Sequence, residues 1–177
     1  MTQSGNEAAL LPTRSLRWKA AAQSVGGRYE PGDFWSPERI TLACSPWILT
    51  LHSEHIQTPL TIVSAATLSR TPLRLTLLGG EFQRDWHGID LADLEIGDMA
   101  FDAPFQITTS SPALAKALFT RPGFRTKLLA LPHLAIDLRR GNLRIATVGI
   151  VDNPESLITL LAIGVEILQT QSFPNIS

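Results

Sequence analysis

The chain has 177 residues, 44% of them hydrophobic and 18% charged, which suits a single globular domain with a substantial core. The net charge is −1, so the chain has no excess of basic residues with which to bind a nucleic acid or an anionic membrane. We therefore expect no nucleic-acid partner. The lone cysteine, Cys44, excludes an internal disulfide, and residues 1–15 do not resemble a secretory signal. We therefore expect a cytoplasmic protein. No apolar run reaches the ~20 residues of a membrane-spanning helix.

The first half of the chain predicts a helix followed by strands. We expect residues 1–14 to be a disordered tail and residues 15–177 to form one domain. Ser15 can cap a helix over 16–25, which the glycine pair at 26–27 ends. Four segments then alternate between apolar and polar residues, as strands with one solvated face do: 39–44, 47–53, 60–68 and 73–79.

The segment Met99–Thr108 also reads as a strand, with Phe101, Phe105 and two smaller residues on one face. Pro104 lacks an N–H group, so this strand is expected at an edge of the sheet or to contain a bulge. Ser111 and Pro112 are typical of a helix start, and a second short helix is expected over 122–129.

The last third of the chain predicts a hairpin and a long helix. Gly141-Asn142 is expected as the two-residue turn, which places Arg139 opposite Arg144. The helix, expected from Pro154 to about Thr170, is apolar over half its circumference, as a core helix lying across the sheet would be. A second interpretation adds a self-association surface, for which the candidates are Ile158, Ile163 and Ile167. The predicted fold class is α+β, an antiparallel sheet of about six to seven strands with helices on one face and a long C-terminal helix.

A motif of the form I-G-D-x-x-F-D-x-x-F-x-[IV] precedes the helix at Pro112. Its residues here are Ile96, Gly97, Asp98, Phe101, Asp102, Phe105 and Ile107. The motif and the helix after it resemble an uncharacterised family of bacterial proteins that are often predicted to be membrane-associated. The resemblance implies a recurring domain without an assigned activity, and it is the only indication of a peripheral membrane association.

Asp98 and Asp102 are the first candidates for chemistry. They could act as a general acid and base, or hold a metal together with His87 in the acidic segment 81–102. The spacing of the acidic residues does not match a calcium loop, however, and an aspartate in a turn readily accepts main-chain N–H bonds. We expect the motif residues Gly97, Asp98, Phe101, Asp102 and Phe105 to be structural, with no metal and no cofactor.

Three further groups of side chains are candidates for binding. Arg139, Arg140 and Arg144 could bind an anion, because like charges that face each other on a hairpin repel. Trp35, Trp47 and Trp86 could line a pocket or fill the core. Cys44 and the four scattered histidines form no recognisable catalytic set.

These observations favour a noncatalytic interaction or scaffold domain that binds a protein partner or a second copy of itself. Self-association would use the C-terminal helix. Two alternatives from other classes stay open: a small-ligand or lipid-binding domain, and a metal-dependent hydrolase that uses the acidic segment 81–102.

Overall fold

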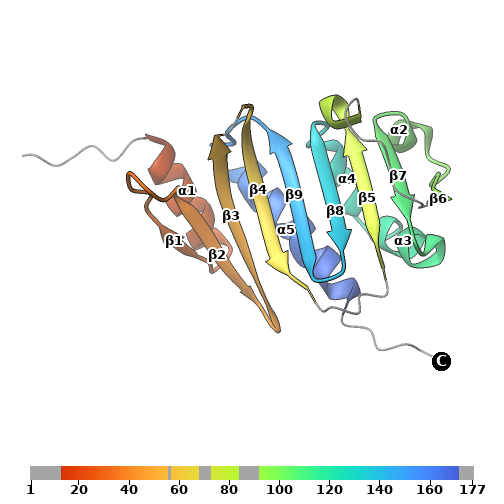
Figure 1. Cartoon of the computed structure of the whole chain (residues 1–177), viewed down its shortest axis with the longest axis horizontal. Coiled ribbons are helices and arrows are strands. Elements are labelled where there is room, and N and C mark those ends of the chain that lie inside the picture. Colours follow the sequence, from red (N-terminus) through yellow and green to blue (C-terminus); the bar gives the residue numbers. More distant parts are fainter. Residues whose placement is uncertain (1–12, 56, 68–72, 84–91, 172–177) are drawn as a thin grey trace, which may run out of the picture.

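The computed structural model describes residues 13–55, 57–67, 73–83 and 92–171. They include one antiparallel sheet of nine strands in the order β1-β2-β3-β4-β9-β8-β5-β7-β6 (Figure 1). The strands are β1 (Arg28–Glu30), β2 (Arg39–Cys44), β3 (Trp47–His55), β4 (Pro59–Ala66), β5 (Leu75–Gly79), β6 (Ala92–Asp93), β7 (Phe105–Thr109), β8 (Leu134–Arg139) and β9 (Asn142–Val148).

The helices are gathered on one face of this sheet (Figure 1). They are α1 (Thr13–Ser24), α2 (Met99–Asp102), α3 (Pro112–Phe119), α4 (Phe124–Leu129) and α5 (Pro154–Thr170), with a 3₁₀ turn, η1 (Gly80–Gln83), after β5. The helix α5 crosses the middle of the sheet over β3, β4 and β9, and α1 packs beside it. Among the described residues no α-helix covers the other side, which we call the open face.

The predicted α+β fold class is confirmed, with more strands than expected. The additional strands β1 and β6 have three and two residues, which is too short for an alternating pattern to be recognised. The helix α1 begins at Thr13, so the last two residues of the expected tail belong to it. None of the described helices has the length and apolar character needed to span a bilayer.

The core lies between the sheet and α5, and it requires a glycine in that helix. A Cβ atom on Gly164 would lie 2.3 Å from Cδ2 of Leu49 and 3.4 Å from a methyl group of Val63. Both of these sheet side chains are fully buried. The absence of a side chain at residue 164 therefore lets the middle of α5 lie close to β3 and β4.

The expected exposed flank of α5 is not present. Ile163 and Ile167 are fully buried in the core, and Ile158 is partly buried against it. The three isoleucines therefore do not form a free surface on α5, because the sheet and the neighbouring helices α1 and α4 pack against this helix.

The β8–β9 hairpin forms where it was predicted, but its register differs by two residues. Arg140 and Gly141 make the turn, and Gly141 supplies the positive φ of 82° that the turn needs. As a result Asp137, not Arg139, faces Arg144. A shift of two residues leaves every side chain on its expected face, which is why the alternating pattern did not reveal the register.

The strand expected over Met99–Thr108 is also corrected. Residues 99–102 form the helical turn α2, and the strand β7 begins only at Phe105. Phe101 and Phe105 both remain in the core, with ring centroids 5.1 Å apart. Two residues that are four positions apart lie on the same side of a helix and also on the same side of a strand. The spacing of Phe101 and Phe105 was therefore compatible with either structure.

Candidate functional site

The open face has an apolar row across its four central strands. The strand pairing places Ile62 of β4 beside Ala146 of β9, Ala146 beside Ala135 of β8, and Ala135 beside Leu78 of β5. Two small side chains thus lie between two large ones. The next row along the strands is polar, with Arg144 of β9 opposite Asp137 of β8.

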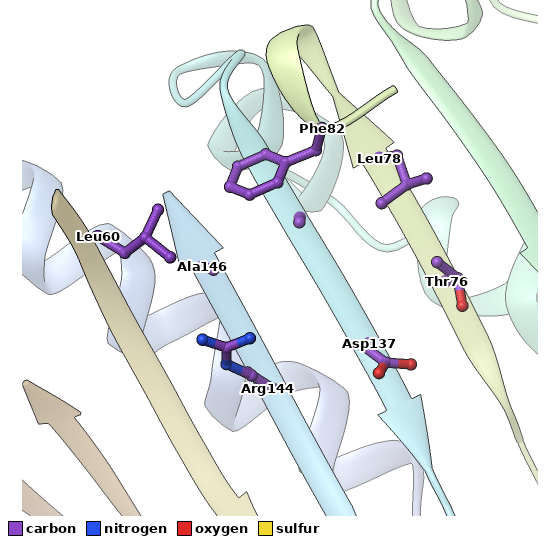
Figure 2. A pocket seen from close by; sticks show the side chains of 8 residues that line it. Leu60, Thr76, Leu78, Phe82, Asp137, Arg144 and Ala146 are labelled. Atoms are coloured by element: carbon purple, nitrogen blue, oxygen red, sulfur yellow. The ribbon is translucent and has the colours of Figure 1, made fainter. Parts of the chain in front are cut away.

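A hollow of about 150 Å³ lies over the two alanines on the open face, with Leu60 and not Ile62 as its lining residue from β4 (Figure 2). Ala135 and Ala146 form its floor. Phe82 reaches over it from η1, and Figure 2 shows its ring between Leu60 and Leu78. Thr76, Asp137 and Arg144 complete the lining at the polar end. The hollow is therefore apolar at one end and carries one charge of each sign at the other.

Both charged residues at the hollow have ion-pair partners outside its lining. Arg139 Nε lies 2.8 Å from Asp137 Oδ2, and Arg144 Nη2 lies 3.2 Å from Glu54 Oε2. Of the three arginines predicted to bind an anion, Arg139 and Arg144 thus already contact carboxylates. Arg140 lies in the exposed hairpin turn. Only Arg144 of these three lines the hollow.

The motif aspartates bind the main chain. The carboxylate of Asp102 accepts hydrogen bonds from the N–H groups of Ile96, Gly97 and Asp98, at 3.0, 2.8 and 3.0 Å. Asp98 caps α2 by accepting the N–H group of Ala100, and it also forms an ion pair with Arg125. Gly97 has a φ of 85°, a conformation that glycine adopts readily. These contacts hold the turn that leads into β7.

The remaining candidates for chemistry that the structure describes are not assembled into a site. His87 and Trp86 lie outside the described residues. Trp47 is buried in the core whereas Trp35 is exposed in a loop, so these two do not line a common pocket. Burial raises the pKa of the Cys44 thiol, which lowers its reactivity. Within the described ranges, no group of three or more histidine, cysteine and acidic residues could hold a metal ion.

Comparison with known proteins gives a likeness in fold. No family model and no curated protein match the chain. Its structure is similar to the crystal structure of the mycobacterial trehalose monomycolate transport factor A, TtfA, with a TM-score of 0.60. The match covers 94% of this chain and 99% of TtfA at 12% sequence identity. At that identity the likeness concerns the fold alone.

Sequence reasoning found Arg144 but missed the hollow around it. The facing pair of Ala135 and Ala146 was the available signal, because small residues on adjacent strands leave space above the sheet. In the predicted register Ala135 faces Val148, so the two alanines were not placed together. Phe82 could not have been predicted there, since its position depends on where η1 ends.

Proposed function

We propose that this chain is a noncatalytic interaction domain that binds one apolar side chain of a protein partner in the hollow of the open face. The observation that carries the proposal is the facing pair of Ala135 and Ala146 between larger apolar side chains. Protein interfaces commonly depend on a few anchoring side chains that fill such pockets.

The size of the hollow favours a side chain over a whole small molecule. Sites for drug-sized ligands usually measure about 300–1,000 Å³. A cavity of about 150 Å³ holds a benzene ring. A hollow of about 150 Å³ therefore suits one phenyl ring or one branched aliphatic group.

Three carboxylates that could serve catalysis are held within the chain, which supports a binding role. The oxygens of Asp102 are engaged by three main-chain donors, and Asp98 is held by a cap and by Arg125. Asp137, at the edge of the hollow, is paired with Arg139. We propose that the motif shapes the turn before β7 and does not contact a substrate.

A small apolar ligand is the second candidate occupant, because the same hollow combines an apolar end with Arg144. The protein of similar fold, TtfA, is a trehalose monomycolate transport factor. Mass spectrometry of the natively purified chain tests this alternative. A bound small molecule that is lost when Ala146 is replaced by leucine would favour the ligand over a protein partner.

The main proposal is tested by NMR titration with N-acetyl-phenylalaninamide, which carries a single phenyl side chain. We expect weak, saturable binding that shifts the methyl signals of Ala135 and Ala146. Ala146→Leu should abolish it by filling the hollow. Ala43→Leu is the matched control, since Ala43 is an exposed residue of the open face on β2, away from the hollow. Binding that survives both Ala146→Leu and Ala135→Leu would contradict the proposal.

A further inference from the structure

The loop between β1 and β2 exposes two adjacent aromatic side chains. Phe34 is 88% exposed and Trp35 87% exposed, and their rings meet edge to face with centroids 4.8 Å apart. Large aromatic side chains are enriched at protein interfaces and are costly to leave in water. The pair is therefore a candidate contact surface.

The loop that carries this pair is held in one conformation. The carboxylate of Asp33 accepts the N–H groups of Trp35 and Ser36 at 2.8 and 2.7 Å, and these bonds keep the pKa of Asp33 below its usual value. A Cβ atom on Gly32 would lie 2.6 Å from the nitrogen of Glu38, so the two sides of the loop are in close contact. The backbone that carries the aromatic pair thus has little freedom left to lose on binding.

A second anchor ties the loop to the first helix. Glu38 forms an ion pair with Arg14 of α1 at 2.6 Å and accepts a hydrogen bond from the hydroxyl of Tyr29 at 3.0 Å. The loop follows the edge strand β1, whereas the hollow spans β4, β9, β8 and β5, with β2 and β3 between them (Figure 1). The aromatic pair therefore cannot enter the hollow of its own chain.

From these observations we infer that the partner bound in the hollow is a second copy of this chain, inserted through Phe34. This inference rests on the proposed function of the hollow. The phenyl ring of Phe34 matches the benzene-sized volume of about 150 Å³. The charges add no preference: Arg144, 45% exposed at the edge of the hollow, is paired with Glu54 and faces Asp137, so the lining has no net charge toward Asp33 beside the ring.

The geometry of such a contact is head to tail. Loop and hollow are different surfaces, so each bound copy still offers one free loop and one free hollow, and the chains form a ring or an open filament. Two aromatic side chains bury about 150–250 Å² each. Since this is well below the roughly 800 Å² per partner of a stable interface, association should be weak and concentration-dependent.

Two variants with complementary defects test the inference by sedimentation velocity. Phe34→Ala/Trp35→Ala removes the loop surface, and Ala135→Leu/Ala146→Leu fills the hollow. We expect the average mass of the unmodified chain to rise with concentration and each variant alone to remain monomeric. An equimolar mixture of the two should form a one-to-one heterodimer, because one intact loop and one intact hollow remain. Met99→Ala, which removes a side chain that is 88% exposed elsewhere, should associate like the unmodified chain.

Three results would overturn the inference: a monomeric unmodified chain up to the highest soluble concentration, variants that associate as well as it does, or a mixture that stays monomeric. The proposed function fails separately. If the chain is monomeric but N-acetyl-phenylalaninamide still binds and Ala146→Leu still abolishes binding, the hollow binds something other than a second copy. Circular dichroism of each variant establishes that it is folded.

Discussion

At the scale of single residues, Asp102 determines the conformation of the chain before β7. Its carboxylate accepts three consecutive main-chain N–H groups, while Asp98 caps the helical turn from the other side. The sequence indicated that these aspartates bind backbone donors, since aspartate beside glycine is typical of turns. It could not indicate a helical turn, because the spacing of Phe101 and Phe105 fits helix and strand alike.

Replacing Asp102 by alanine should lower the free energy of unfolding by about 1–2 kcal/mol, because three N–H groups lose their acceptor and recover only part of that loss from water. Urea denaturation measures the change. Glu95→Ala is the matched control, an exposed acidic residue in the same segment, with an expected effect within about 0.5 kcal/mol. Equal unfolding midpoints for Asp102→Ala and the unmodified chain would show that the turn does not depend on this carboxylate.

At the scale of the elements, the close packing of α5 on the sheet depends on Gly164. Glycine is a poor helix former, so its place in the middle of a 17-residue helix needs a reason in packing. The contact with Leu49 supplies it. The sequence predicted the helix and its apolar character correctly, but it could not show which strands lie under which turn of the helix, because that depends on the strand order.

We expect Gly164→Ala to be destabilising. Helix propensity alone would stabilise the variant by about 1 kcal/mol. Against this, overpacking a buried site costs about 1–3 kcal/mol. We expect a net loss of about 1 kcal/mol, which Leu49→Val should partly relieve in the double variant.

Ala162→Gly on the same helix is the control, since residue 162 is only partly buried and should report propensity alone. Chemical denaturation of Gly164→Ala, Leu49→Val, their double variant and Ala162→Gly supplies the comparison. If Gly164→Ala stabilises the chain by as much as Ala162→Gly destabilises it, packing against Leu49 does not limit this position.

At the scale of the whole molecule, one continuous core joins both ends of the sheet. The buried cluster extends from Trp18 on α1, across β3, β4 and β9, to Phe101 of α2 and Phe105 of β7. The indole N–H group of Trp18 donates a hydrogen bond to the carbonyl oxygen of Val151 at 3.0 Å. This bond links the first helix, α1, to the segment that precedes the last helix, α5. The alternating pattern predicted the strand side chains that face α5, but not the burial of Ile62, Thr76 and Leu78 on the open face, and the connection through Trp18 depends on long-range packing.

Unfolding should therefore be a single cooperative transition, although the chain exceeds the length at which two-state behaviour is usual. Tryptophan emission and far-ultraviolet circular dichroism should give the same midpoint in urea. Trp35→Phe is a useful background, because it removes an exposed fluorophore without changing the core. Separate midpoints for the two signals would indicate that the β1–β4 end and the β5–β7 end unfold independently.

The strand order has a consequence for how the polypeptide matures during synthesis. The hairpin of β8 and β9 is made late, yet it is inserted between β4 and β5, which are neighbours along the chain but not in the sheet. One side of β4 lacks its ladder partner until β9 is complete at residue 148, and one side of β5 lacks its partner until β8 is complete at residue 139. Between the completion of β5 at residue 79 and that of β8 at residue 139, the nascent chain thus carries two unpaired strand edges, and the last strand made closes the middle of the sheet.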